Sequence, residues 1–274
     1  MGENLNSKTK SGIIWDLSGA FARQFIYLFI SILLARLLEP EEFGIIGISM
    51  VFVSIVEVFT DVGFTSGLIQ QTQTKDITYS SVFYINLLIS ALLTILIIFT
   101  APAIARFYNE PIVEDILLWL AVIPIIAALG RVQSAILVKE MDFKSLTLRD
   151  LTATAVGGGL GVGAAFLDYG VFSLVIQQIA TAMTSTMMLW LATVWRPKLE
   201  FSKYEVSKLF GYSMFVFLDS LLRQVFNRID TIFIGKAFSP VMLGYYSRAE
   251  SLKAQVQTYT TNSLRKVIFP VLSK

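Results

Sequence analysis

Arginine side chains inside apolar segments are the residues of this sequence best suited to bind an anion. Arg23 and Arg223 each lie near the middle of a long hydrophobic stretch, and Arg228 follows in the second stretch. A charged side chain within a membrane is costly, so it tends to face a cavity or an oppositely charged partner. The planar guanidinium group matches the oxygens of a phosphate. We therefore predict that Arg23, Arg223 and Arg228 bind a phosphate-containing substrate.

Purely structural roles are the alternative for these arginines. Asp219 precedes Arg223 by four residues, so the two side chains could pair within one helix. Arg228 could pair with a neighbouring helix. Arg131 and Arg248 also lie in apolar segments, and both could extend their guanidinium groups to the membrane interface. The residue types alone leave both roles open.

A second candidate site consists of two carboxylates, Glu57 and Asp61, which lie four residues apart on one face of a predicted helix. In a medium of low dielectric constant such a pair could share a proton or hold a sodium ion, which would suit coupling to an ion gradient. The alternative, which we favour, is that they lie near the outer end of the helix or pair with basic residues.

Several kinds of catalytic site are excluded by the residue types that the sequence lacks. It contains no cysteine and no histidine, which removes thiol nucleophiles, Cys/His zinc sites and histidine general bases. The glycine-rich run 157–163 lies within an apolar stretch that no strand precedes, so close helix packing explains it better than nucleotide binding. We therefore expect no enzymatic activity, no cofactor, no bound metal and no nucleic-acid partner.

The composition indicates a protein embedded in a membrane. Apolar residues make up 55% and charged residues 15% of the chain, and the mean hydropathy is +0.67. Soluble domains contain about 45–50% apolar and about 25% charged residues. A membrane helix needs roughly 20 apolar residues, so we predict an all-α integral membrane protein with about eight transmembrane helices. The predicted helices cover residues 13–35, 43–68, 82–104, 116–138, 151–167, 171–194 and 209–235, and an eighth begins near Leu243.

The distribution of basic residues predicts a cytoplasmic N-terminus. With this orientation the outward loops of the first six helices hold only Arg36 and Arg106. Basic residues favour the cytoplasmic side of a membrane, which supports the assignment. The inward segments hold Lys8, Lys10, Lys75, Lys139, Lys144, Arg149, Arg196, Lys198, Lys203 and Lys208.

The sequence also matches itself at an offset of 200 residues. Both copies contain a helix, a basic residue, a proline and a glycine in the same order, which suggests two parallel lobes related by an axis along the membrane normal. Chance similarity between two apolar helices is the alternative. The identical pairs are Arg23 and Arg223, Gln24 and Gln224, Ile32 and Ile232, Pro40 and Pro240, and Gly44 and Gly244.

This repeat divides the chain into four predicted parts. Residues 1–12 form a cytoplasmic N-terminal tail, 13–194 a complete six-helix lobe, and 195–208 a basic cytoplasmic linker. Residues 209–274 begin a second lobe, of which we expect only the first two helices, so that the sequence is truncated.

Short motifs along nearly the whole chain resemble one family of membrane transporters. They are SGIIW at 11–15, LARLLEPEEFG at 34–44, DVGF at 61–64, LIQ at 68–70, ARFY at 105–108, MDF at 141–143, WRP at 195–197 and LGYYSRA at 243–249. Together they resemble the Wzx-type polysaccharide flippases, particularly the branch related to colanic acid exporters.

The resemblance implies the fold of the multidrug/oligosaccharidyl-lipid/polysaccharide exporter superfamily, with two six-helix lobes. It implies that undecaprenyl-pyrophosphate-linked oligosaccharides cross the bacterial inner membrane by alternating access, for O-antigen, colanic acid or exopolysaccharide. The expected partners are the lipid-linked oligosaccharide and membrane lipids, with the polysaccharide polymerase machinery as a further candidate. A cationic central cavity is expected, and we place it at Arg23 and Arg223.

Three other functions stay open at this point. A cation-coupled multidrug exporter of the same superfamily would need an acidic cavity, for which Glu57 and Asp61 are the best candidates, but the mid-helix arginines argue against it. A membrane-embedded glycosyltransferase would need acidic loop motifs that we do not find. A nonfunctional truncated fragment is the third alternative.

Overall fold

The computed structural model describes residues 2–61, 63–71 and 74–253, and every regular element in these ranges is a helix. Five helical segments are long and apolar enough to cross a membrane, and a sixth is added if the bent pair Lys203–Leu209 and Met214–Ala237 forms one span. The all-α membrane fold is therefore confirmed. The total of about eight spans stays a prediction, and the last predicted helix beyond residue 253 lies outside the described residues.

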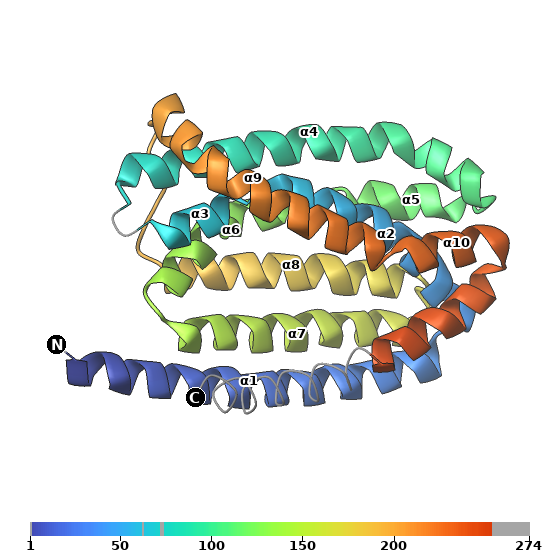
Figure 1. Ribbon diagram of the computed structural model, residues 1–274. Helices are drawn as coiled ribbons and strands as arrows, with labels where there is room; N and C mark the ends of the chain where they lie inside the picture. The colour runs from blue at the N-terminus through green and yellow to red at the C-terminus, as the bar shows by residue number, and fades with distance from the viewer. Residues whose placement is uncertain (1, 62, 72–73, 254–274) are drawn as a thin grey trace, which may run out of the picture.

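The helices lie side by side and run back and forth between the two ends of the molecule (Figure 1). A further helical stretch, residues 240–253, follows the last of the labelled helices. The labelled helices are α1 (Gly2–Leu37), α2 (Pro40–Asp61), α3 (Phe64–Gln70), α4 (Asp76–Tyr108), α5 (Ile112–Leu120), α6 (Ile123–Lys139), α7 (Phe143–Phe166), α8 (Phe172–Ala192), α9 (Lys203–Phe226) and α10 (Ile229–Ala237).

Most of each predicted apolar segment is helical where the structure describes it, but three predicted helices are divided. The segment 209–235 is divided at Asn227 and Arg228 between α9 and α10. The segment 43–68 is divided between α2 and α3, and Gly63 adopts φ 75°, a left-handed conformation that glycine adopts without steric cost. The segment 116–138 is divided between α5 and α6. At the N-terminus, α1 begins at Gly2 and thus includes the predicted tail. Whether the chain forms two lobes stays a prediction.

Glycines allow α7 to pack closely against its neighbours. A Cβ atom on Gly157 would lie only 1.9 Å from Thr181 Oγ1 on α8. A Cβ atom on Gly158 would lie 2.0 Å from Ile30 Cδ1 on α1. Small residues that let membrane helices approach in this way stabilise their packing. The predicted packing role of the glycine-rich run is therefore confirmed.

The turn between α8 and α9 is held to α4 at the end of the molecule where the N-terminus lies (Figure 1). Lys198 pairs with Asp76 at 3.0 Å, and Lys75 pairs with Glu205 at 3.5 Å. The hydrogen bond to Asp76 raises the pKa of Lys198. Two of the basic residues predicted to face the cytoplasm therefore form ion pairs between separate chain segments. The orientation of the chain in the membrane stays a prediction.

Candidate functional site

A cavity of about 170 Å³ lies where the stretch 240–253 meets α1, α2 and α8. Arg248 lines it, donates a hydrogen bond to Ser31 Oγ at 2.8 Å, and stacks its guanidinium 3.4 Å from the ring centroid of Phe43. Its Nε and Nη2 atoms are buried and have no hydrogen-bond partner among the described residues. Leaving buried charged donors unpaired costs free energy, so an anion in this cavity would relieve that cost.

A second cavity, of about 400 Å³, is lined by residues of α2, α6, α7 and α8. Arg131 lines it and donates hydrogen bonds to the backbone oxygen of Glu57 at 3.2 Å and to Thr60 Oγ1 at 3.1 Å. The Nε atom of Arg131 is buried without a hydrogen-bond partner in the described part of the chain. Glu57 and Arg149 also line this cavity, so it contains two cations and one carboxylate.

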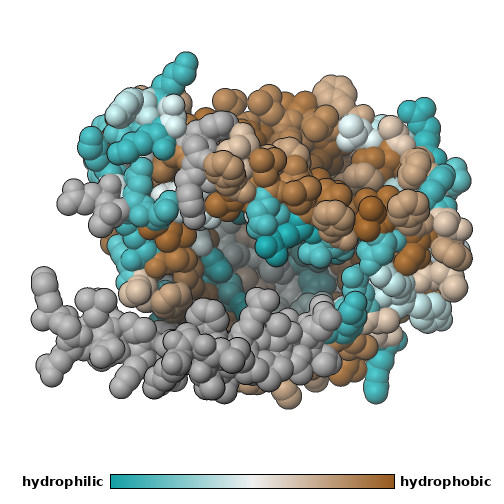
Figure 2. Space-filling model, viewed as in Figure 1, coloured by the Kyte–Doolittle hydropathy of each residue, from teal (hydrophilic) through white to brown (hydrophobic). Residues whose placement is uncertain are grey.

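The two cavities adjoin, because Met50 and Gln178 line both. Figure 2 shows that the face of the molecule in view is hollowed, with hydrophilic residues inside the hollow and hydrophobic residues on the surface beside it. Arg248 lines the first of these adjoining cavities, and Arg131 and Arg149 line the second. A polar, positively charged interior in an apolar protein suits a ligand with both anionic and polar groups.

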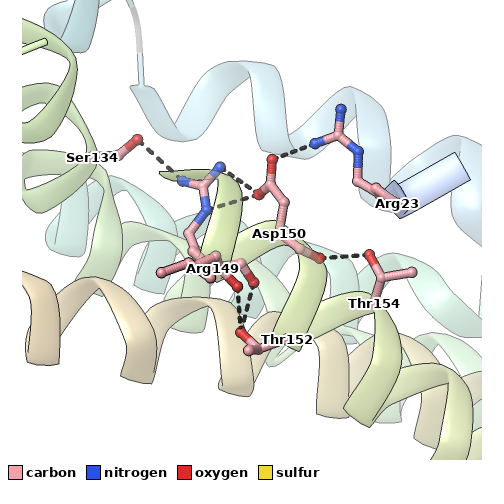
Figure 3. A network of polar contacts seen from close by, with 7 residues as sticks. Arg23, Ser134, Arg149, Asp150, Thr152 and Thr154 are labelled. Atoms are coloured by element: carbon pink, nitrogen blue, oxygen red, sulfur yellow. Dashed lines mark hydrogen bonds and ion pairs between the residues drawn. The ribbon is translucent and has the colours of Figure 1, made fainter. Parts of the chain in front are cut away.

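A network of polar contacts holds Arg149 in place (Figure 3). Asp150 accepts two hydrogen bonds from Arg149, at 2.8 and 2.6 Å, and forms an ion pair with Arg23 of α1. Arg149 also donates to Ser134 Oγ of α6 at 3.3 Å. Both Arg23 and Arg149 line a third cavity of about 290 Å³. Asp150 therefore fixes the direction of Arg149 and connects α1 to α7.

None of the three arginines predicted to bind substrate lines the first or the second cavity, although Arg23 lines the third cavity, which shares Arg149 with the second. Arg23 pairs with Asp150, as described above. Arg223 pairs with Asp219 of its own helix at 2.8 Å and its side chain is 74% exposed, so the intrahelical pair considered as the alternative role is present. Arg228 is the N-cap residue of α10. No contact recorded for the described residues brings Arg23 and Arg223 together, and their binding role stays a prediction.

The two predicted ion-coupling carboxylates have different surroundings. Glu57 lines the second cavity, beside Arg131. Asp61 accepts hydrogen bonds from the backbone nitrogen of Thr65 at 3.0 Å and from its hydroxyl at 2.5 Å, at the start of α3. Within the described ranges no group of three or more Asp, Glu, His or Cys could hold a metal ion. Ion coupling stays a prediction, for which Glu57 is the better placed residue.

Sequence reasoning missed the arginines that do line the adjoining cavities. Arg131 and Arg248 lie in apolar segments, where their guanidinium groups could also extend to the membrane interface. Arg149 is predicted only as a basic residue of an inward segment. One further signal was present in the sequence. Several polar residues interrupt the segment 171–194, and three of them at helical spacing, Gln178, Thr181 and Ser185, line the second cavity.

Residues 33–274 match a protein-family model described as polysaccharide biosynthesis protein. The chain belongs to this family. The resemblance to polysaccharide transporters predicted from the motifs is thus confirmed at the level of the family.

Curated relatives of this family member take part in making several bacterial polysaccharides. The chain is 23% identical to the succinoglycan biosynthesis transport protein ExoT of Rhizobium meliloti (strain 1021). It is 22% identical to the teichuronic acid biosynthesis protein TuaB of Bacillus subtilis (strain 168) and 18% identical to the lipopolysaccharide biosynthesis protein WzxC of Escherichia coli (strain K12). The matches cover 99–100% of this chain but 56% of each relative, so the chain spans about half their length.

One solved structure is also similar to this family member. It is the MATE multidrug transporter DinF-BH, solved as a complex, with a TM-score of 0.49 and 12% identity, covering 92% of this chain and 61% of that one.

Proposed function

We propose that this protein takes part in moving lipid-linked oligosaccharides across the bacterial inner membrane for the synthesis of surface polysaccharide. The substrate class we propose is an oligosaccharide attached to undecaprenyl pyrophosphate. Membership of the polysaccharide biosynthesis protein family and the similarity to ExoT, a succinoglycan biosynthesis transport protein, support this proposal. The observation that carries it is Arg248, a cation inside a membrane protein with two buried donor atoms that have no hydrogen-bond partner among the described residues.

In this proposal the first cavity receives the pyrophosphate. Arg248 donates its unpaired Nε and Nη2 groups to the phosphate oxygens, and Phe43 and Ser31 hold the guanidinium in place. Charge-assisted hydrogen bonds of this kind are shorter and stronger than neutral ones. No covalent step is required, since the energy of binding comes from satisfying a cation that is already buried.

The second cavity, in the same proposal, receives the first sugars. It is the larger of the two, and hydroxyl and amide side chains such as Gln178, Ser134 and Ser185 line it. Arg131 and Arg149 add positive charge for acidic sugars or for the second phosphate. The polyprenyl chain stays in the lipid. With the N-terminus in the cytoplasm, alternating access of these cavities to the two sides would carry the headgroup outward.

Complementation of a strain that lacks the gene tests this proposal. The variants Arg248→Ala and Arg248→Lys are expressed from the intact gene, and surface polysaccharide and accumulated lipid-linked oligosaccharide are measured. We expect Arg248→Ala to reduce polysaccharide about 10- to 100-fold, because a hydrogen bond to a charged group contributes about 1.5–3 kcal/mol. Arg248→Lys should restore part of the loss, since it keeps the charge but not the planar fork.

A matched control separates this effect from a general loss of basic residues. Lys75→Ala removes a cation whose side chain is 77% exposed and lies outside the adjoining cavities, so it should leave polysaccharide near the parent level. Normal polysaccharide from Arg248→Ala, at normal amounts of protein in the membrane, would overturn the assignment of the first cavity.

The second candidate function is cation-coupled export of small organic compounds. It is favoured by Glu57, the carboxylate that lines the second cavity. Glu57→Gln would abolish the dependence of drug efflux on an ion gradient while surface polysaccharide stays normal. The reverse outcome, lost polysaccharide with unchanged drug resistance, supports the main proposal.

A further inference from the structure

Two glycines at matching positions of the sequence repeat contact each other's helix. Gly44 lies in the first turn of α2, and Gly244 lies in the first turns of the stretch 240–253. A Cβ atom added to Gly44 would lie 1.9 Å from the backbone oxygen of Pro240. A Cβ atom added to Gly244 would lie 1.8 Å from the backbone oxygen of Pro40. Each glycine therefore lets its own helix approach the proline of the other.

This contact is reciprocal in the way that a two-fold axis requires. When two equivalent segments pack about such an axis, residue i of one contacts residue j of the other, and j contacts i. Here Gly44 meets Pro240 while Gly244 meets Pro40, and the two glycines, like the two prolines, are related by the offset of 200 residues seen in the sequence. Two unrelated apolar helices would have no reason to form matched contacts at matched positions.

The glycine contact lies directly beside the first cavity. One turn further along, a Cβ atom on Gly47 would lie 3.1 Å from Ser247 Oγ, and both residues line the cavity. Phe43 and Arg248, which hold the proposed anion site, line it as well. The contact is close to the turn between α1 and α2, at the end of the molecule away from the N-terminus (Figure 1). The cavity is thus bounded at that end by backbone packed against backbone.

We infer that the reciprocal contact of Gly44 and Gly244 is a gate that closes the adjoining cavities at the end away from the N-terminus. The two helices approach this closely because Gly44 and Gly244 have no Cβ atom, so even a substitution with alanine should keep the gate from closing. For a ligand to pass at this end, α2 and the stretch 240–253 must separate. The inference deepens the proposed function, but the state of the gate can be measured without any substrate.

Cysteine labelling tests the gate, since the sequence contains no cysteine and an introduced thiol is therefore unique. Gln178→Cys places the thiol in both cavities, and a membrane-impermeant maleimide is added to the membrane side opposite the N-terminus. That side is identified by labelling of Glu110→Cys, in the turn between α4 and α5. With Gly44→Ala or Gly244→Ala added, we expect Gln178→Cys to react at least several-fold faster, because the new methyl group forces the helices apart.

The matched control is Gly159→Ala, which adds the same methyl group at a position where no atom of the described residues lies within 4 Å. It should leave the labelling rate unchanged. Labelling that Gly44→Ala and Gly244→Ala both leave at the parent rate would overturn the gate. Should neither variant reach the membrane, a cross-link provides the second test.

The cross-link joins Gly47→Cys to Ser247→Cys. A Cβ atom on Gly47 would lie 3.1 Å from Ser247 Oγ, the atom that a cysteine sulfur would replace, so the two sulfurs could reach the S–S bond length of about 2.05 Å. Oxidation should lower surface polysaccharide more than 10-fold, a reductant should restore it, and the single cysteine variants should show neither effect. Transport at the parent rate by the cross-linked protein would overturn the gate. If the labelling result holds but no polysaccharide depends on the protein, the proposed substrate fails and the gate stands.

Discussion

Arg223 and Arg248 both lie in apolar segments of the sequence, but their guanidinium groups have different surroundings in the structure. Arg223 occupies a position matched by the sequence repeat, yet it pairs with Asp219 and is largely exposed. The position that matches Arg248 in the repeat is Ile48, yet two donor atoms of Arg248 are buried with no partner in the part of the chain that the structure describes. Position in a repeat therefore says less about function than whether the charge is already satisfied.

The matched glycines of the sequence repeat contact each other's helices, whereas its matched arginines have different partners. Arg23 contacts α7 through Asp150, whereas its counterpart Arg223 stays within its own helix. The counterparts Gly44 and Gly244, by contrast, take part in one reciprocal contact. Residues that shape the approach of two helices are constrained equally in both copies, while a charged side chain adapts to whichever partner its copy offers.

The largest expected effect is the difference between replacing Arg248 and replacing Arg223 with alanine. Arg223→Ala should change surface polysaccharide less than about two-fold, because Arg223 already pairs with Asp219 of its own helix. Arg248→Ala should reduce it about 10- to 100-fold. Complementation assays on the two variants side by side check this contrast. Equal losses would show that the repeat position matters as much as burial.

A second prediction compares two glycines of α7. Gly157→Ala forces a Cβ atom against Thr181, and overpacking of this kind costs about 1–3 kcal/mol. Gly163→Ala meets nothing within 4 Å and should be neutral or stabilise by up to about 1 kcal/mol, since alanine favours helix. Thermal unfolding in detergent measures both. Similar melting temperatures for the two variants would contradict the packing described for α7 and α8.

A third prediction concerns the connection between α1 and α7. Asp150→Asn removes the carboxylate that Arg23 and Arg149 share, and we expect a loss of stability of about 1 kcal/mol because all three side chains are partly exposed. The loss should be smaller in a protein that already carries Arg23→Ala, as a double-mutant cycle of unfolding free energies would reveal. Strict additivity of the two changes would mean that the ion pair contributes nothing.

The smallest effect is expected at the exposed pair of Lys198 and Asp76. The pKa of Lys198 is raised in the folded protein by this pairing, so its contribution is present below the ordinary lysine pKa and is lost as the pH rises through the raised value. Proteolysis of the turn between α8 and α9 should therefore increase at strongly alkaline pH. Lys198→Ala should remove this pH dependence, and an unchanged pH profile in that variant would contradict it.

Much of the fold could be predicted from the sequence because the membrane requires long apolar helices. The positions of these helices and the pair of Asp219 with Arg223 depend only on local spacing. The breaks at Gly63 and between α5 and α6 do not follow from hydropathy, although Gly63 and Pro124, at the start of α6, are of the residue types that commonly interrupt a helix. The arginine cavities could not be predicted either. The partners of Arg248, Ser31 and Phe43, lie more than 200 positions away in the chain.

Binding of undecaprenyl pyrophosphate to the purified protein in lipid nanodiscs tests the central claim most directly. The parent protein and the variants Arg248→Ala and Arg223→Ala are titrated with the same lipid, and their dissociation constants are compared. If the first cavity binds the pyrophosphate, Arg248→Ala binds about 10- to 100-fold more weakly and Arg223→Ala binds as the parent does. Equal affinity of Arg248→Ala and the parent protein would contradict the account.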